Sequence, residues 1–231
     1  MPPLPLNGVQ VSTVQEEPMK RYSLRTTTRK RLFPVDLARI AVMTALIAVL
    51  GLPGAFPIFG LVPITAQTLG VMLAGAILGP LRGALSVVVL LTLTAVGAPL
   101  LAGGRGGLGV FLTPSAGYLL GWIPAAVVIG MLVHWRGLKP TMVRTLAANV
   151  VGGILVVYAV GIPIQSALTG LTVGETALTS VVFLPGDVLK VVVGALIVKA
   201  LVEGYPRAYQ RDWPGREITV EVNERARSAA S

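Results

Sequence analysis

The sequence predicts an all-α, polytopic membrane protein folded as a bundle of six transmembrane helices. Hydrophobic residues make up 54% of its 231 residues and charged residues only 13%, about half the share in an average soluble domain. From Ile40 to Thr65 the chain carries no charged residue, so water would solvate this run poorly. Apolar runs such as Leu85 to Leu91 lack the alternating pattern of a membrane β-barrel, which leaves helices as the spanning elements.

Six apolar segments meet the length that a membrane helix requires, about 20 residues for about 30 Å of hydrocarbon. We place them at residues 36–57, 64–80, 82–98, 113–134, 141–162 and 180–202. The second and third are short and are separated by Gly79-Pro80-Leu81-Arg82-Gly83. Because proline lacks an amide hydrogen and glycine is conformationally permissive, this segment predicts a break between two antiparallel helices.

The two ends of the chain differ in composition from the transmembrane domain, residues 36–202. Residues 1–35 contain six Lys or Arg and two Glu, and we predict a basic, disordered cytoplasmic extension. Residues 203–231 are predicted to form a charged cytoplasmic tail. The basic N-terminal segment lacks the interleaved aromatic residues of a nucleic-acid-binding module, so nucleic acid is not an expected partner.

The distribution of cations predicts the orientation in the plasma membrane, because cytoplasmic loops are rich in Lys and Arg. Cations occur in the N-terminal segment and in the links after the second and fourth spans, and Lys199 closes the sixth span. The alternate connections carry only Arg105 and Glu175. An even number of spans that starts inside therefore predicts a multi-pass protein with both termini cytoplasmic.

The clearest functional signal is a pair of charges, Asp187 and Lys190, in the predicted sixth span. An ionisable side chain within a span costs at least about 2.5 kcal/mol at the midplane, so each needs a partner or a water-filled cavity. A spacing of three places both on one helix face, in the outer half of the membrane. Two interpretations remain: a substrate site open to the outside, or an ion pair that only locks helix packing.

A second polar group, Thr65, Gln67 and Thr68, lies at the outer mouth of the second span. Gln67 is one turn from Gly70 and two from Ala74, so its amide projects from a face of small residues that another group can approach closely. Gln67 either binds substrate or forms an interhelical hydrogen bond. The two threonines either join the site or cap the helix start.

A glycine-dense outer connection contains Gly104 and Arg105 within Gly103-Gly104-Arg105-Gly106-Gly107-Leu108-Gly109. It lacks the Gly-Lys-Ser/Thr of a phosphate loop, which argues against nucleotide binding. Such a loop can approach a ligand closely or close over it, and Arg105 can clamp a carboxylate. The alternative is a flexible connector whose arginine meets lipid phosphate.

Further candidates lie inside the predicted spans. Tyr118 and Trp122 either belong to the aromatic belt at the membrane interface or form a wall of the pocket, and for Trp122 the belt is the expectation. Asn149 lies in the middle of the fifth span, where an amide requires a partner, and is a weaker site candidate.

Enzymatic catalysis is not predicted, and no metal or other cofactor is expected. The chain has no cysteine and one histidine, His134, which lies at the opposite end of its span from Ser115. Asp36 and Asp187 are predicted at opposite sides of the membrane, too far apart to share a proton. What remains is an outward-facing pocket for a small, neutral-to-anionic polar ligand with an apolar body.

Over most of residues 36–202 the chain resembles the BioY family, the biotin-specific substrate-binding (S) components of energy-coupling factor (ECF) transporters. Five motifs in order carry the resemblance: Pro63-Ile64-Thr65-x-Gln67-Thr68-Leu69-Gly70, Ala74-Gly75-x-x-Leu78-Gly79-Pro80-x-Arg82-Gly83, Gly103-Gly104-x-Gly106-Gly107-Leu108-Gly109, Gly117-Tyr118-Leu119 and Pro185-Gly186-Asp187-x-x-Lys190. It implies a six-helix bundle that takes biotin from outside. It also implies association with a transmembrane coupling subunit and two ATPase subunits.

The resemblance further implies that Asp187, Lys190 and the loop around Arg105 belong to a biotin site. The ureido ring of biotin offers two N–H donors and a carbonyl, and its valerate chain ends in a carboxylate. We assign Lys190, with Arg105, to the carboxylate and Asp187, with Gln67, to the ureido edge; the reverse assignment remains open. The chain departs from the family pattern at residues 113–117, which read Thr-Pro-Ser-Ala-Gly where Gly-Pro-Thr-Gly-Gly is usual.

Small residues recur along the first span at Ala41 and Ala45, with Ala38 and Ala48 nearby. In this family such a stripe is similar to the docking face for the coupling subunit, and packing within the bundle is the alternative. For the whole protein, two other functions stay open: a carrier or sensor for another small vitamin-like ligand, and an intramembrane hydrolase. Binding without turnover would distinguish a carrier from the hydrolase.

Overall fold

The computed structural model describes residues 21–23, 34–52, 65–135, 140–205 and 219–221. The chain divides into two compact units, Lys30–Pro214 and a second unit formed by Met1–Arg29 and Gly215–Ser231. The described part of the second unit is an antiparallel pair of strands, β1 (Arg21–Ser23) and β2 (Thr219–Glu221). Other parts of residues 1–33 and 206–231 lie outside the described residues, so the predicted extension and tail stay predictions.

The unit Lys30–Pro214 is all-α in its described part, as predicted. Short 3-10 helices, Leu108–Leu112 and Val181–Phe183, precede α3 and α7, and a π-helix, Val150–Val156, joins α4 to α5. The α-helices are α1 (Pro34–Val49), α2 (Gln67–Ala95), α3 (Ala116–Val133), α4 (Met142–Asn149), α5 (Val157–Thr169), α6 (Val173–Ser180) and α7 (Leu184–Gly204).

Four helical stretches in the described residues are long and apolar enough to cross a membrane: Gln67–Ala95, Ala116–Val133, Met142–Thr169 and Val173–Gly204. The predicted number of six spans is not confirmed. α1 has only 16 residues, and part of the predicted first span lies outside the described residues. Most of the predicted second and third spans lies within α2.

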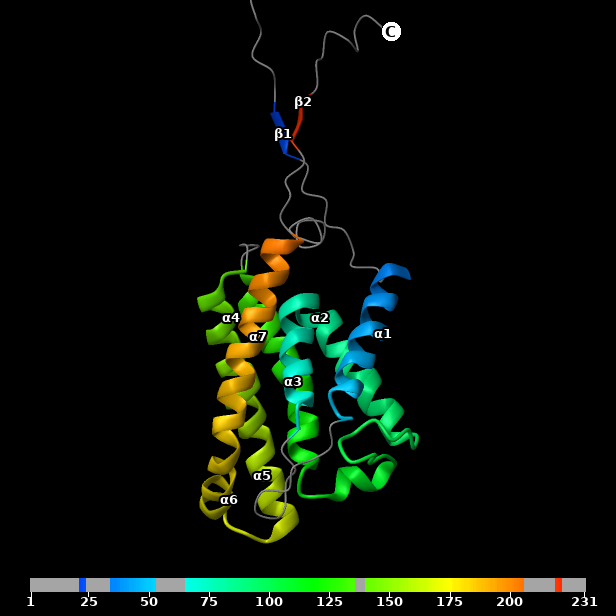
Figure 1. Ribbon diagram of the computed structural model, residues 1–231, viewed down its shortest axis with the longest axis vertical. Helices are drawn as coiled ribbons and strands as arrows, with labels where there is room; N and C mark the ends of the chain where they lie inside the picture. Colours follow the sequence, from blue (N-terminus) through cyan, green and yellow to red (C-terminus); the bar gives the residue numbers. More distant parts are fainter. Residues whose placement is uncertain (1–20, 24–33, 53–64, 136–139, 206–218, 222–231) are drawn as a thin grey trace, which may run out of the picture. The chain divides into compact units, whose positions relative to one another are not determined.

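The chain turns back on itself within α2, and the two halves run in opposite senses (Figure 1). Gly79 has non-helical backbone angles, φ 80° and ψ −179°, and Pro80 follows it. A β-carbon added to Gly83 would lie 2.6 Å from the carbonyl oxygen of Ala74, whereas residues nine apart in a straight helix are separated by about 13.5 Å. The predicted break is therefore confirmed, and the glycine-proline pair causes it.

Other predicted boundaries are wrong. α1 ends at Val49 rather than at residue 57, and Gly51 just beyond it lies against another segment, since an added β-carbon would be 2.9 Å from the Gln67 amide. The helix predicted at 141–162 continues to Thr169, where Gly170 adopts the left-handed conformation that ends it. The sixth predicted span begins earlier, at Val173, as α6.

Glycines let neighbouring helices approach α3 closely, and α3 contacts α2, α4 and α5. Gly75 of α2 lies against the backbone of Ala126, where an added β-carbon would be 2.6 Å from the carbonyl oxygen. On another side, Gly117 lies against the backbone of Gly161 in α5. Small residues at such contacts are typical of membrane helix bundles, because they bring backbones together.

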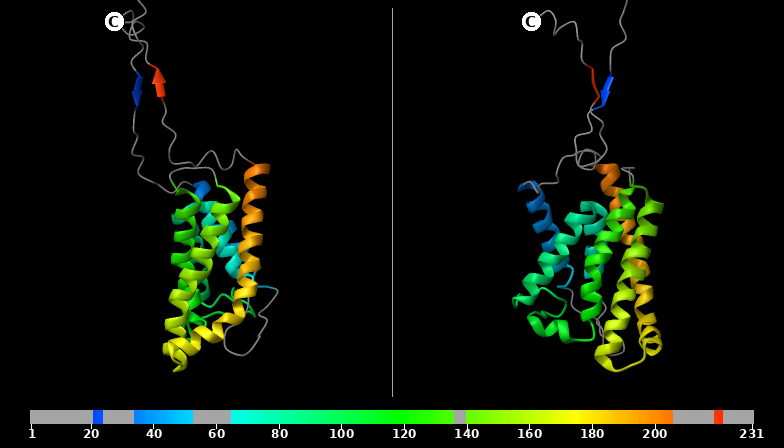
Figure 2. Two further views of the ribbon diagram at one scale, coloured as in Figure 1. Left: turned by 90° about the vertical axis from the view of Figure 1, so that its left-hand side faces the viewer. Right: turned by 180° about the vertical axis from the view of Figure 1, so that it is seen from behind.

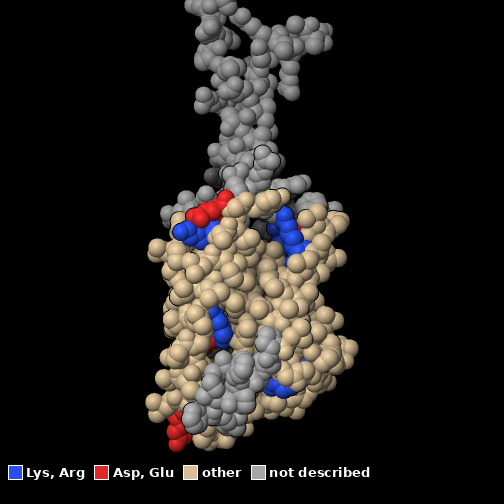
Figure 3. Space-filling view, viewed as in Figure 1, with Lys and Arg blue, Asp and Glu red and all other residues tan. Residues whose placement is uncertain are grey.

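Two ends of this unit can be distinguished in Figures 1 and 2. The start of α1, the turn within α2 and the end of α7 lie at one end, which we call the Asp36 end. There, Arg82 Nη2 lies 3.0 Å from Asp36 Oδ1, and this ion pair links α1 to α2. Residues 96–115 and 170–172 lie at the other, the Arg105 end. On the face shown in Figure 3, charged side chains are few among tan residues.

Candidate functional site

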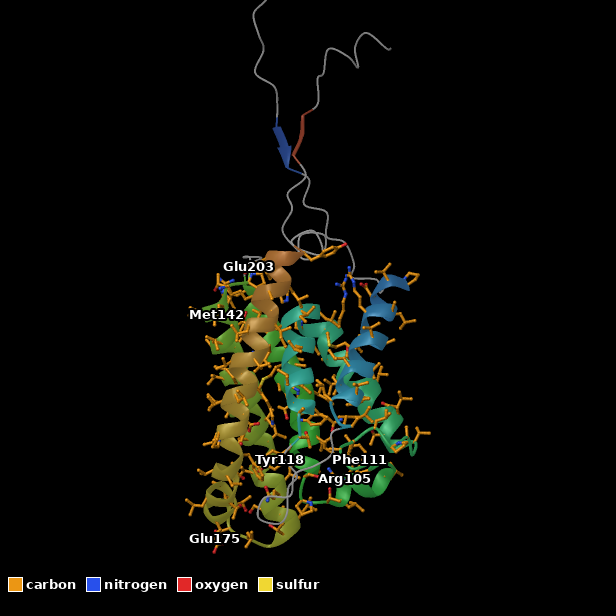
Figure 4. The ribbon with its side chains drawn as sticks, in the orientation of Figure 1. Arg105, Phe111, Tyr118, Met142, Glu175 and Glu203 are labelled. Atoms are coloured by element: carbon orange, nitrogen blue, oxygen red, sulfur yellow. The ribbon has the colours of Figure 1, made fainter. Side chains whose placement is uncertain are left out.

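A cavity of about 70 Å³ lies near the Arg105 end, several times the roughly 10–15 Å³ that one water molecule needs. Figure 4 shows Arg105 and Tyr118 near this end, with Met142 and Glu203 at the opposite one. Six of the eight predicted substrate-binding residues line the cavity: Thr65, Gln67, Arg105, Tyr118, Asp187 and Lys190. The other lining residues are Thr68, Ser115, Leu119, Trp122, Gly153, Val157, Tyr158 and Phe183.

Asp187 lies in the first turn of α7, where the helix dipole favours a negative charge. It is buried, and each carboxylate oxygen accepts one hydrogen bond: Oδ1 from Lys190 Nζ at 2.9 Å, Oδ2 from the Tyr158 hydroxyl at 2.7 Å. Two N–H groups of Lys190 have no partner in the described part of the chain, which leaves them for a ligand. Because Asp187 and Lys190 share one helix, their ion pair cannot by itself lock two helices together. This favours the substrate-site interpretation.

Tyr158 is a cavity residue that sequence reasoning missed. It lies at the start of α5, directly after the π-helix, and reaches Asp187 on α7. The only sequence signal was a lone tyrosine within an apolar run of the fifth span. The direction of its side chain depends on the π-helix, and hydrophobic periodicity does not reveal a π-helix.

Arg105 brings an unpaired positive charge to the cavity. Its Nη1 donates to Ser115 Oγ at 3.3 Å and its Nε donates to the carbonyl oxygen of Ala102 at 3.2 Å. Arg105 forms no ion pair with any described residue. Burial lowers the pKa of its guanidinium from the ordinary value, because desolvation disfavours the charged form.

The glycine-dense loop holds Arg105 in place through a tight turn. Leu101 and Arg105 form an isolated antiparallel bridge, and the two residues between Ala102 and Arg105 are glycines with positive φ, 77° and 69°. L-residues with side chains rarely adopt these angles, so this turn requires glycine. Gly104 is one of the two. It is exposed and does not line the cavity, so it shapes the loop in this structure.

Three charges therefore meet at the cavity: Arg105, Lys190 and Asp187. With both basic groups protonated and the carboxyl group ionised, their sum is one positive charge. Asp187 is already paired with Lys190, so the uncompensated charge is that of Arg105. A low-dielectric cavity with one excess cation favours a ligand that carries one negative charge.

Gln67 has little hydrogen-bonding capacity left for a ligand. Its amide nitrogen donates to the carbonyl oxygens of Ile47 at 3.3 Å and Leu100 at 3.0 Å, and its Oε1 accepts from Ala102 N at 3.0 Å. It is 1% exposed. The amide thus ties α1 and the loop after α2 to the start of α2, which is the interhelical alternative of the sequence prediction.

The aromatic residues of α3 form a wall of the cavity. The Tyr118 hydroxyl donates to Gln165 Oε1 at 2.7 Å and lies 2.8 Å from Ser180 Oγ, so it is held by α5 and α6. The Tyr118 ring meets that of Tyr158 edge-on, with centroids 5.9 Å apart. Trp122 is buried and lines the cavity, so the expected interfacial belt position is wrong.

The structure also places the two threonines and Asn149. α2 starts after Ala66 without a side-chain cap, so Thr65 and Thr68 do not cap it, and both line the cavity. Asn149 does not line the cavity. It is fully buried against α7, where its amide nitrogen donates to the carbonyl oxygen of Val191 at 3.4 Å. Its Oδ1 has no partner among the described residues.

Three of the four small residues of α1 face away from the described bundle, while Ala48 is half-buried and packs against the core. Ala38, Ala41 and Ala45 are exposed, while Ile40 and Ile47 of the same helix are buried. No group of three His, Asp or Glu side chains that could hold a metal ion occurs in the described ranges.

Comparison with known proteins gives one consistent family. A model of the BioY family matches residues 20–207. The chain is 46% identical to the biotin transporter BioY of Rhizobium etli, over 74% of this chain and 95% of the relative. It is 43% identical to the biotin transporter BioY of Rhodobacter capsulatus, over 75% of this chain and 96% of the relative.

A solved structure has the same fold. The crystal structure of the S-component for biotin from an ECF-type ABC transporter matches with a TM-score of 0.69 and 33% sequence identity. The match covers 73% of this chain and 91% of the solved chain.

Proposed function

The chain belongs to the BioY family, and we propose that it captures biotin for uptake across the cell membrane as the S component of an ECF transporter. The relatives and the solved neighbour are named for biotin, which supports this substrate. Both relatives are named as transporters, which supports transport rather than catalysis.

The charge of the cavity carries this proposal. Biotin is a monocarboxylate, and its single negative charge balances the one excess positive charge of Arg105, Lys190 and Asp187. Its ureido group offers N–H donors and a carbonyl acceptor, which complement a carboxylate beside an ammonium. Its apolar ring and chain suit a wall formed by Leu119, Trp122 and Phe183.

Within this site we assign the carboxylate of biotin to Arg105 and the ureido group to Asp187 and Lys190. Arg105 is the cation without an acidic partner, so a carboxylate gains most there. Lys190 already neutralises Asp187 and retains two N–H groups, which suits donation to the ureido carbonyl. Gln67 then supports the loop that carries Arg105 and does not bind biotin through its amide nitrogen.

In the membrane we propose six spans, with the two halves of α2 counted separately and the Asp36 end in the cytoplasm. Both the start of α1 and the end of α7 lie at that end, which supports cytoplasmic termini. It also carries Arg39, Arg82 and Lys199, as cytoplasmic ends do. The exposed Ala41 and Ala45 then form the docking face for the coupling subunit, which acts with two ATPase subunits.

Equilibrium binding of labelled biotin to the full chain in detergent tests the substrate. We expect saturable binding without turnover. Lys190→Gln should weaken it about 10- to 100-fold, the effect of losing a hydrogen bond to a charged group. Lys199→Gln is the matched control, because it removes the same charge from an exposed residue of the same helix. Absence of saturable binding by the unaltered protein would reject the proposal.

Co-purification of a tagged coupling subunit tests the docking face. Ala41→Trp places a bulky ring on the exposed face of α1 and should abolish co-purification while biotin binding persists. Leu196→Trp, on an exposed position of α7, is the control. If Ala41→Trp still co-purifies with the coupling subunit, the docking face lies elsewhere on the protein.

A further inference from the structure

Tyr158 makes the one hydrogen bond that connects Asp187 to another helix in the described part of the chain. Lys190, the other partner of Asp187, belongs to the same helix and moves with it. The Tyr158 hydroxyl comes from α5 and lies 2.7 Å from Asp187 Oδ2. The position of the carboxylate relative to the rest of the cavity therefore depends on Tyr158.

Tyr158 is itself held by neighbours on other helices. Its ring meets the Tyr118 ring edge-on at 88°, a favourable aromatic geometry. The Tyr118 hydroxyl is fixed by Gln165 of α5 and Ser180 of α6. Tyr158 thus transmits the packing of α3, α5 and α6 to one carboxylate oxygen on α7.

The π-helix between α4 and α5 explains how Tyr158 reaches α7. Asn149 and Tyr158 are nine residues apart, about two and a half turns of an α-helix, which would place them on opposite faces. Both nonetheless contact α7, Asn149 at Val191 and Tyr158 at Asp187. The wider turns of Val150–Val156 bring the second side chain back to the face of the first.

We propose that Tyr158 is a positioning residue that fixes Asp187 as an acceptor for ligand N–H groups, and that the π-helix aims it. The inference rests on the proposed function, since the ligand N–H groups are those of the biotin ureido ring. A hydroxyl donor on Oδ2 and an ammonium on Oδ1 hold the carboxylate as an acceptor-only group. The remaining lone pairs then select a ligand that donates hydrogen bonds, so Tyr158 determines specificity without being the group that binds.

The test compares biotin with an analogue methylated on a ureido nitrogen, using the purified full chain. Tyr158→Phe keeps the ring and removes the donor. We expect biotin affinity to fall about tenfold or more and the preference for biotin over the methylated analogue to shrink several-fold. A residue that only stabilised the fold would weaken both ligands equally and leave that preference unchanged, and such a result would overturn the proposal.

Thr44→Val is the comparison, because it removes a buried hydroxyl that donates to the carbonyl oxygens of Ile40 and Ser86 and does not line the cavity. It should lower thermal stability but keep the ligand preference of the unaltered protein. If Tyr158→Phe does not yield folded protein, Tyr158→Met carries the same test, since it fills the space flexibly without a donor. No biotin binding by the unaltered protein would reject the proposed function instead, which separates the two failures.

Discussion

The two ends of the bundle each contain a buried aspartate paired with a cation, yet the pairs differ in what they connect. At one end, Arg82 of α2 lies 3.0 Å from Asp36 of α1. At the other, Lys190 lies 2.9 Å from Asp187 on the same helix, beside a cavity. An ion pair between two helices holds the bundle together. An ion pair within one helix cannot do so, and both members of this pair line the cavity.

The largest expected effect comes from the pair beside the cavity. Asp187→Asn removes the charge that accepts from Lys190 and Tyr158 and should weaken biotin binding about 100-fold or more, close to 3 kcal/mol. Equilibrium binding measures the loss. Unchanged affinity would show that the Asp187 carboxylate does not bind biotin.

The pair at the Asp36 end should respond in the opposite way. Asp36→Asn removes the negative charge that pairs with Arg82 and should lower stability by about 2 kcal/mol, less than for a fully buried pair because Arg82 is partly exposed. Biotin affinity should change less than threefold. Thermal unfolding in detergent and equilibrium binding on the same sample separate the two effects.

Arg105 allows a finer test of the cavity end, because it identifies which part of biotin faces the loop. Arg105→Gln should weaken biotin binding about tenfold but leave the binding of biotin amide nearly unchanged, since the amide has no carboxylate for the guanidinium. The ratio of the two affinities is the measurement. An equal loss for both ligands would assign the carboxylate to Lys190 instead.

The smallest effect on biotin binding concerns the turn within α2. Gly79→Ala places a side chain at φ 80° and ψ −179°, a region essentially confined to glycine, and should cost about 1–3 kcal/mol of stability. The space around Gly79 is open apart from the ring of His134 at 3.8 Å, so conformation and not crowding sets the cost. Biotin affinity should be unaffected, which thermal unfolding with and without ligand can verify.

The sequence was sufficient to locate features that depend on the residue type alone. Asp187 and Lys190 stood out because charges are costly in an apolar span, and Gly79-Pro80 marked the turn because no side chain contact is needed to break a helix there. The sequence was insufficient where the contacts of a side chain depend on a segment far away in the chain. The amide of Gln67 is occupied by the loop at residues 100–102, and Trp122 is buried by neighbouring helices.

Tyr158 and Asn149 illustrate the same limit within one helix. A regular helix would turn the two side chains apart, and the π-helix between them makes both meet α7. π-helices have no sequence signature comparable to a glycine-proline pair, so helical periodicity could not predict which of the two reaches the cavity.

The length of the first half of α2 has a consequence for the surrounding lipid. From Gln67 to Leu78 it rises about 18 Å, well short of about 30 Å of hydrocarbon. The non-helical backbone of residues 100–102, which hydrogen-bonds to Gln67 at the start of this helix, would then lie at membrane depth, and this is tolerated only where protein shields it from acyl chains. The Gln67 side chain contributes to this protection, because it donates a hydrogen bond to the carbonyl oxygen of Leu100 and accepts one from the amide of Ala102. A ligand bound in the cavity would accordingly lie below the headgroup layer, and bilayer thickness should influence its dissociation rate.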